Sequence, residues 1–248
     1  MIVAESLSKA FRSKSRNSKK TVQAVQSVSF TADNNQITGL LGQNGAGKST
    51  TLRMLATLLP PDSGTASIDD FDVVTNPLSA KQHLGFMPHN SGIYPRLTAR
   101  ENILYYARLC GMSKNDSSSR VTELVEQLDM SGFIDRRSAG FSQGQKTKVA
   151  LARALAHRPR TIMLDEPTNG LDVMATRGLR EILRSLATDG HCILFSSHIM
   201  QEVAALCDHI VIIAEGQIVT ADSLTGILSA TGQNNLEDAF VSAIGETV

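Results

Sequence analysis

Short apolar runs alternate along the chain with segments that have the apolar spacing of helices, and this alternation is visible at three places. QITGLLG leads into GKSTTLRMLATLL, TIMLDEP precedes a second helical segment, and HCILFSSH precedes a third. The second segment presents one apolar face and ends near Gly190. That face consists of Leu179, Ile182, Leu183 and Leu186. Such alternation is typical of an α/β fold with a parallel sheet, which we therefore expect.

The pattern between Leu97 and His157 changes to almost continuous helical periodicity. Thr98 and Glu101, in the segment TARE, fit a capping box at the start of a helix. A further apolar helix face consists of Val121, Leu124, Val125 and Leu128. This region therefore predicts a helical insert within the α/β core.

The length of the chain allows a sizeable core, since 248 residues can form one large domain. The content of 42% hydrophobic and 19% charged residues is that of an ordinary globular protein. We expect a single domain over 1–248. Its predicted parts are an α/β core at 1–88 and 158–220, a helical subdomain at about 89–157 and a C-terminal extension at about 221–248.

Charge and cysteine content argue against several classes of protein. The 24 basic residues balance the 24 acidic ones, so the whole chain has no field that favours nucleic acid or an anionic membrane. The cysteines Cys110, Cys192 and Cys207 lie far apart, which argues against a disulfide framework or a zinc site and favours a reducing cytosol. Apolar runs are far shorter than the roughly 20 residues that span a bilayer, so we expect no membrane crossing.

One local cluster of positive charge stands apart from this balance. The segment KAFRSKSRNSKK, residues 9–20, contains six basic residues among serines and predicts a long flexible loop between two strands. Two interpretations remain open for it. The segment is either the solvated tip of a hairpin or a contact for phosphate or lipid.

The segment GQNGAGKST fits the phosphate-loop pattern G-x-x-x-x-G-K-[ST] between a strand and a helix. Its glycines allow the backbone to curl with N–H groups inward, and the following helix N-terminus adds partial positive charge. We expect Lys48 to neutralise terminal phosphate charge and Ser49 to bind Mg²⁺, with the Thr50 hydroxyl nearby. The nucleotide-binding residues predicted in this loop are Gly42, Asn44, Gly45, Ala46, Gly47, Lys48, Ser49 and Thr50.

Three further polar residues follow apolar strands, where open α/β sheets bind their ligands. Asp165 is expected to hold Mg²⁺ through water, and the adjacent Glu166 to polarise an attacking water. Such a pair alone is more often a helix cap, but beside a phosphate loop it indicates phosphoryl transfer to water. His198 ends the strand CILFSSH in the same way and is expected near the γ-phosphate, although an isolated histidine is more often a cap or surface group.

Taken together, the motifs resemble those of one family, the nucleotide-binding subunits of ABC transporters. The segment FSQGQKTKVALARAL is similar to the family's signature motif and the helix after it, with Ser142, Gly144 and Gln145 in matching places. NGLD, which ends at Asp172, is similar to the D-loop, and SSHIMQE to the H-loop with His198 as its switch histidine. The resemblance covers essentially the whole chain.

The resemblance implies a P-loop NTPase (RecA-like) α/β core with an N-terminal antiparallel β subdomain and an inserted α-helical subdomain that carries the signature motif. It implies a Mg²⁺-dependent ATPase that works as a homodimer, with ATP enclosed between the phosphate loop of one subunit and the signature motif of the other. Ser142, Gly144, Gln145 and Asp172 would then belong to the ATP site. Phe11 matches the aromatic that stacks on adenine in this family, whereas an isolated phenylalanine is more often a core residue.

Within this family, FSSHIMQEVAALCD and LEDAFVSAIGE resemble the ATPase subunits of bacterial two-component exporters, nearest to the NatA-like sodium exporters. The resemblance implies an integral membrane permease as partner, a place at the cytoplasmic face of the cell membrane and possible sodium export. The alternative is a soluble ABC ATPase that acts on ribosomes or nucleic acid. Such proteins usually have tandem cassettes or long coiled-coil insertions, and this chain has neither and no net basic charge, so no nucleic acid is expected as a partner. A nucleotide kinase or GTPase would leave FSQGQ, NGLD and His198 unexplained.

Two positions depart from the family pattern. Gln143 stands in the signature motif where a small residue is commoner, and His89 follows GFMP where the family has the glutamine of its Q-loop. That glutamine contacts Mg²⁺ and the attacking water. An imidazole can bind metal or water in a different geometry and becomes a cation near about pH 6.5. His89 is therefore either a functional substitute that contacts Mg²⁺ or a loop residue without this role.

Overall fold

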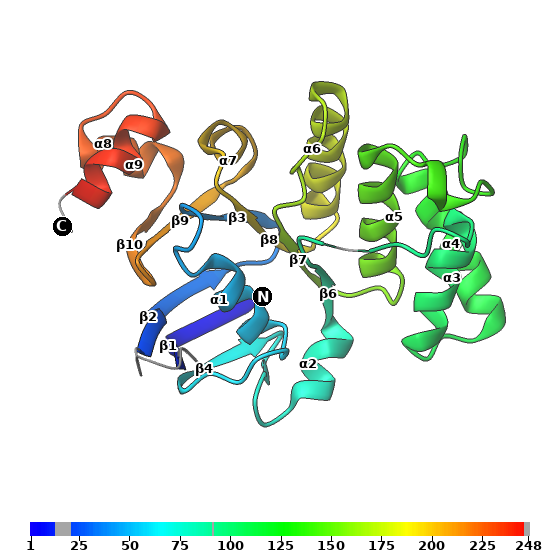
Figure 1. Cartoon of the computed structure of the whole chain (residues 1–248), viewed down its shortest axis with the longest axis horizontal. Coiled ribbons are helices and arrows are strands. Elements are labelled where there is room, and N and C mark those ends of the chain that lie inside the picture. The colour runs from blue at the N-terminus through cyan, green and yellow to red at the C-terminus, as the bar shows by residue number, and fades with distance from the viewer. Residues whose placement is uncertain (13–20, 91, 246–248) are drawn as a thin grey trace.

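A computed structural model describes residues 1–12, 21–90 and 92–245. The chain forms two sheets with a helix between them, further helices over the outer face of the larger sheet, and a separate group of helices at one end (Figure 1). The predicted α/β core, the N-terminal antiparallel sheet and the inserted helices are all present, so the expected fold class is confirmed. The division of residues 1–248 at positions 88, 157 and 220 stays a prediction.

The larger sheet has the strand order β10-β9-β3-β8-β7-β6, in which only β10 runs antiparallel to its neighbour. Its strands are β3 (Gln36–Leu41), β6 (Leu84–Met87), β7 (Thr161–Asp165), β8 (Cys192–Ser197), β9 (His209–Ala214) and β10 (Gln217–Asp222). Every residue of β7 and β8 is buried, as expected for central parallel strands that are covered on both faces. The carboxyl ends of these strands therefore meet at one edge, where the candidate site lies.

The smaller sheet is antiparallel and has the order β2-β1-β4-β5. Its strands are β1 (Ile2–Arg12), β2 (Thr21–Ala32), β4 (Ser63–Ile68) and β5 (Phe71–Asp72). The expected loop at residues 9–20 is wrong for residues 9–12, because cross-strand pairs from Lys9 to Arg12 continue the ladder between β1 and β2. The other residues of that basic segment, 13–20, lie outside the described residues.

Helices occupy both faces of the larger sheet. α1 (Lys48–Leu55) lies between the two sheets and contacts β1, β2, β4 and β7, whereas α6 (Val173–Thr188) and α7 (Met200–Leu206) cover the opposite face at β3 and β8. The three predicted strand–helix units are thus β3–α1, β7–α6 and β8–α7. α2 (Pro77–His83) precedes β6 at the end of the smaller sheet.

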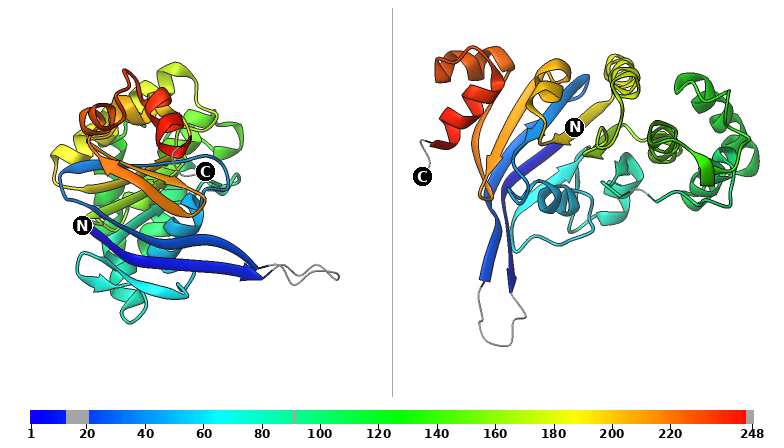
Figure 2. Two further views of the ribbon diagram at one scale, coloured as in Figure 1. Left: turned by 90° about the vertical axis from the view of Figure 1, so that its left-hand side faces the viewer. Right: turned by 45° about the horizontal axis from the view of Figure 1, so that its top comes forward.

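The inserted helices are α3 (Ala99–Leu109), α4 (Lys114–Gln127) and α5 (Gln143–Leu155), with a short 3₁₀ turn at Ser138–Gly140. The predicted capping box between Thr98 and Glu101 is present, with both reciprocal hydrogen bonds. The helices lie at one end of the molecule, and α8 (Leu224–Thr231) and α9 (Leu236–Gly245) lie at the opposite end against β10 and α7 (Figure 2). In the described part of the chain, no helix is long and apolar enough to cross a bilayer.

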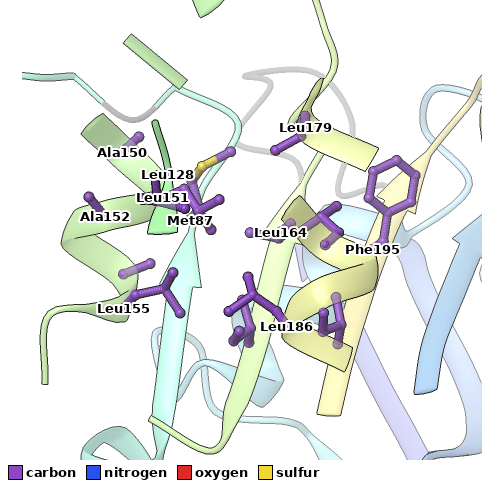
Figure 3. Close-up of a cluster of buried hydrophobic side chains, with 14 of the residues drawn as sticks. Met87, Leu128, Ala150, Leu151, Ala152, Leu155, Leu164, Leu179, Leu186 and Phe195 are labelled. Carbon is purple, nitrogen blue, oxygen red and sulfur yellow. The ribbon is translucent and has the colours of Figure 1, made fainter. Parts of the chain in front are cut away.

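A continuous apolar core joins the helical insert to the sheet (Figure 3). Leu179 and Leu186 of α6 pack with Leu164 of β7 and Phe195 of β8, as the apolar face predicted for this helix requires. Met87, at the end of β6, is buried beside α5. Because Met87 is held in this core, the position of the segment that follows it, including His89, is determined by packing at the junction of the two subdomains.

Candidate functional site

The phosphate loop connects β3 to α1 and passes very close to other backbone segments. A Cβ atom added at Gly42 would lie 2.4 Å from the carbonyl oxygen of Ile213, and one added at Gly47 would lie 2.6 Å from that of Ala24. Gly47 also has a left-handed backbone, with φ of 108°. Glycine is therefore required at these two positions by space and, at Gly47, by conformation.

The loop offers a group of backbone donors without protein acceptors. Within the described residues, no acceptor is found for five of its N–H groups, which belong to Gly45, Gly47, Lys48, Ser49 and Thr50. Some of these groups lie in the first turn of α1, where a helix carries partial positive charge. The same residues line one pocket. Such an arrangement fits an anionic phosphate chain, because phosphate oxygens supply the missing acceptors.

Lys48 is almost fully buried at the base of this loop. Its Nζ donates to the carbonyl oxygens of Gly42, at 2.6 Å, and Gln43, at 3.1 Å, and lies 3.6 Å from Glu166 Oε1. Burial lowers the pKa of the Lys48 ammonium more than the nearby Glu166 and Asp165 carboxylates raise it. The nearby carboxylates therefore do not fully compensate the positive charge of the buried ammonium, and a phosphate group would supply the missing negative charge.

Asp165, at the carboxyl end of β7, is 4% exposed. Its Oδ1 accepts hydrogen bonds from Ser196 Oγ at 2.7 Å and from Ser49 Oγ at 3.3 Å. A carboxylate and a hydroxyl are hard oxygen ligands of the kind that Mg²⁺ prefers together with substrate phosphates. The residues present thus fit Mg²⁺. Among the described residues, there is no group of three or more His, Cys, Asp or Glu side chains that could hold a metal ion.

Glu166 has a left-handed backbone, with φ of 49°, which is unusual for a residue other than glycine. Such a conformation costs on the order of 1–3 kcal/mol and persists where surrounding contacts enforce it. Here the Glu166 N–H donates to both the carbonyl oxygen and the hydroxyl of Ser196, each at 3.1 Å. β8 therefore sets the direction in which the Glu166 side chain leaves β7.

The Glu166 carboxylate has nitrogen atoms around it from three other segments. Besides Lys48, His198 Nδ1 lies 3.2 Å from Oε1 and His89 Nδ1 lies 3.7 Å from Oε2. The His198 contact has the distance of an ion pair but lacks hydrogen-bond geometry, so its Nδ1 has no hydrogen-bond partner among the described residues. The structure brings together the predicted residues Lys48, Ser49, Asp165, Glu166, His198 and His89.

His89 lies at the wall of this site. Its side chain is 38% exposed and borders two pockets that also include Glu166. The first of these pockets extends to Gln143 and Lys146 of α5, so the unusual Gln143 also faces the region near Glu166. Both departures from the family pattern therefore lie beside the candidate site. A metal-binding role of His89 stays a prediction.

The signature residues lie away from the phosphate loop of the same chain. Ser142 begins α5 with a capping box to Gln145, and Asp172 begins α6 by accepting from the Ala175 N–H at 2.8 Å. Gly144 allows these two helix starts to approach, since a Cβ there would lie 3.0 Å from that of Ala175. Ser142, Gly144 and Gln145 line a pocket with α6 residues rather than with the phosphate loop.

Phe11 lies near the end of β1, opposite Val22 of β2. Its side chain is 43% exposed, so the interpretation as a core residue is wrong. Phe11 does not line the phosphate-loop pocket, although Ala24 of β2 does. Adenine stacking by Phe11 stays a prediction. Ser196 is the contact that sequence reasoning missed, because within the segment SSHIMQE only His198 was given a role.

Comparisons with known proteins agree on one family. A model of the family described as ABC transporter matches residues 25–169. The chain is 40% identical over 245 residues to the ABC transporter ATP-binding protein NatA of Bacillus subtilis, with 98% of both chains covered. It is also 40% identical over 193 residues to the Nod factor export ATP-binding protein I of Burkholderia lata, which covers 78% of this chain and 64% of that protein. A solved structure described as the dimeric structure of MJ0796, a bacterial ABC transporter cassette, is similar at 25% identity and a TM-score of 0.79, with 90% of this chain and 99% of that chain covered.

Proposed function

Because the chain belongs to the ABC transporter family as an ATP-binding subunit, we propose that it is a Mg²⁺-dependent ATPase that powers export through a separate integral membrane permease. The observation that carries the proposal is the Glu166 carboxylate, 3.6 Å from the Lys48 ammonium at the phosphate loop. Hydrolysis needs such a group, because a water molecule must lose a proton as it attacks. Nucleotide binding alone does not require it.

ATP binding is assigned to the loop of residues 42–50. The N–H groups without protein acceptors donate hydrogen bonds to phosphate oxygens. The Lys48 ammonium, which now donates to two carbonyl oxygens, binds the terminal phosphate instead. Ser49 and Asp165 hold Mg²⁺, which when bound neutralises phosphate charge and orients the triphosphate. The contact between these two side chains, at 3.3 Å, supports their assignment to one metal ion.

The general base in this proposal is Glu166. It takes a proton from the attacking water, a role worth about 10²- to 10⁴-fold in rate. Its left-handed backbone, held by β8, points the carboxylate toward the phosphate loop. His198 lies against the same carboxylate and contacts the γ-phosphate side of the site. Both residues then act only when a nucleotide fills the space beside them.

We propose that the site is completed by a second copy of the chain. Ser142, Gly144, Gln145 and Asp172 do not line the phosphate-loop pocket of their own chain, so a partner copy would supply them. The N-terminus of α5 would then stabilise γ-phosphate charge. The similar solved structure of a dimeric cassette supports this arrangement. ATP therefore holds the dimer together, and hydrolysis releases it.

Two residues at the border of the site receive more specific roles. Phe11 stacks on adenine, which its exposed ring and its place near the strand that contacts the phosphate loop both allow. His89 takes the place of the Q-loop glutamine and contacts Mg²⁺ or the attacking water, since its ring lies 3.7 Å from Glu166. Because His89 follows β6 at the junction with the helical insert, it would link nucleotide state to the permease.

The proposed location is the cytoplasmic face of the cell membrane, through contact with the permease. Export is supported by the similarity to a Nod factor export protein. Sodium as the cargo is proposed from the motif resemblance to the NatA-like exporters, with which the similarity to NatA over nearly the full length agrees. The test is reconstitution of the chain with its permease in vesicles. We expect ATP hydrolysis that requires Mg²⁺ and Na⁺ movement that requires ATP.

Separate results would contradict the separate parts of this proposal. Hydrolysis without Na⁺ movement would reject sodium but retain the ATPase. Absence of Mg²⁺-dependent hydrolysis in the reconstituted complex would reject the ATPase itself. Co-purification with ribosomes or RNA, rather than with a multi-helix membrane protein, would favour the soluble alternative.

A further inference from the structure

A single buried hydroxyl contacts both acidic residues of the candidate site. Ser196 lies in β8 with none of its surface exposed, directly beside Asp165 in the parallel register. Its Oγ donates to Asp165 Oδ1 at 2.7 Å and accepts from the Glu166 N–H at 3.1 Å. Both the donor and an acceptor position of the hydroxyl are therefore used within the site.

We propose that Ser196 is a positioning residue that orients the Asp165 carboxylate for the metal ion. The inference rests on the ATPase function proposed above and gives a role to a serine that lies in the segment SSHIMQE but to which no motif assigned one. Asp165 Oδ1 accepts from Ser196 and Ser49, and in the described part of the chain no protein donor contacts Oδ2. The two bonds to Oδ1 restrict rotation of the carboxylate, which leaves Oδ2 for the metal or its water.

Ser196 and Ser49 are not equivalent donors to Asp165. The Ser49 hydroxyl belongs to the phosphate loop and is itself assigned to Mg²⁺, and its contact with Asp165 is the longer one, at 3.3 Å. When Ser49 binds the metal ion, Ser196 becomes the donor that keeps Asp165 in place. Groups that orient a metal ligand through a hydrogen bond in this way contribute to the metal affinity of a site.

Ser196 follows three apolar residues in β8, so its buried hydroxyl needs hydrogen-bond partners. Ile193, Leu194 and Phe195 are fully buried and apolar, and a buried polar group among them is costly unless it is hydrogen-bonded. Loss of the Ser196 hydroxyl would affect Asp165 more than Glu166. The Glu166 N–H also donates to the Ser196 carbonyl oxygen, at 3.1 Å, and that bond survives any side-chain substitution.

The test compares Mg²⁺-dependent and Mg²⁺-independent nucleotide binding by titrating the full chain with a fluorescent ATP analogue, once with Mg²⁺ and once with EDTA. For Ser196→Ala we expect an affinity roughly 10- to 100-fold weaker than wild type with Mg²⁺. With EDTA the affinity should equal that of wild type. The matched control is Ser197→Ala, since Ser197 is also buried but its hydroxyl accepts from the Ile199 N–H and does not contact Asp165. This control should bind like wild type in both conditions.

The inference would be overturned if Mg²⁺ increased the nucleotide affinity of wild type and of Ser196→Ala by the same factor. It would also be overturned if Ser196→Ala lost as much nucleotide affinity in EDTA as it does with Mg²⁺, because such a loss indicates general damage to the site. If the alanine variant fails to fold, Ser196→Cys replaces it, because a thiol has similar volume but is a weak donor, and the same outcomes apply. Absence of any Mg²⁺ effect in wild type would overturn the ATPase proposal as well. The two failures are therefore distinguishable.

Discussion

His198 Nδ1 lies 3.2 Å from Glu166 Oε1, although the two residues are far apart in sequence and follow different strands. Glu166 follows β7 and His198 follows β8, and the parallel register of these strands places Asp165 opposite Ser196. The contact thus depends on strand pairing rather than on either motif.

Replacement of Glu166 by glutamine should separate binding from hydrolysis. Glu166→Gln removes the proton acceptor but keeps the size of the side chain, so we expect ATP to bind while the hydrolysis rate falls about 10²- to 10⁴-fold. The ATP-bound dimer should then accumulate, which light scattering with size-exclusion chromatography would show. Glu181→Gln on the exposed face of α6 serves as the control and should behave like wild type. Normal turnover in Glu166→Gln would remove Glu166 from the mechanism.

Removal of the buried ammonium should abolish tight nucleotide binding. Lys48→Ala loses the cation whose pKa burial already lowers, and with it the group that phosphate charge would stabilise. We expect strongly weakened ATP binding in an equilibrium titration, with a folded chain by circular dichroism. Lys114→Ala, at an exposed position in α4, is the control. Unchanged ATP affinity in Lys48→Ala would contradict the assignment of the phosphate loop.

His89→Gln should alter the coupling between the ATPase and the permease. The His89 ring lies beside Glu166, and an imidazole donates and accepts hydrogen bonds in a different geometry from the amide of glutamine. We expect higher permease-stimulated hydrolysis in the variant. His83→Gln, at a ring stacked on Phe71 outside the site, is the control. If His89→Gln leaves the permease-stimulated hydrolysis rate unchanged, His89 is a loop residue without a catalytic contact.

Stability should decrease on acidification because two partly buried histidines resist protonation. Burial lowers the pKa of the His157 and His191 side chains, although each also has a hydrogen bond to a backbone carbonyl that raises it. Unfolded histidine titrates near about pH 6.5, so below that pH the unfolded chain binds more protons than the folded one. The free energy of unfolding should therefore fall as the pH falls below this value.

Urea denaturation at about pH 7.5 and about pH 5.5 measures this loss. His157→Gln should reduce the difference between the two conditions, because glutamine does not titrate and can still donate to the Leu84 carbonyl oxygen that His157 now contacts at 3.2 Å. An unchanged difference in this variant would show that protonation of His157 makes no contribution to acid destabilisation.

Much of this protein was determined by local sequence patterns. The phosphate loop, the capping box at Thr98 and the apolar face of α6 each depend on residues close together in sequence, so spacing alone predicted them correctly. The extent of β1 was different. Residues 9–12 have the composition of a loop, but their pairing with β2 makes them part of a strand. Cross-strand hydrogen bonds, which depend on a distant segment, outweighed local composition.

The tertiary structure alone decided how the polar residues meet. Sequence placed Asp165, Glu166 and His198 at strand ends, but their distances follow from the register of β7 with β8. The same register brought the Ser196 hydroxyl within hydrogen-bond distance of Asp165 and Glu166, a contact that its place in the segment SSHIMQE did not indicate. The packing of Met87 likewise placed His89 beside Glu166. Sequence thus determined which groups are available for the chemistry, and long-range packing determined which of them are within reach of one another.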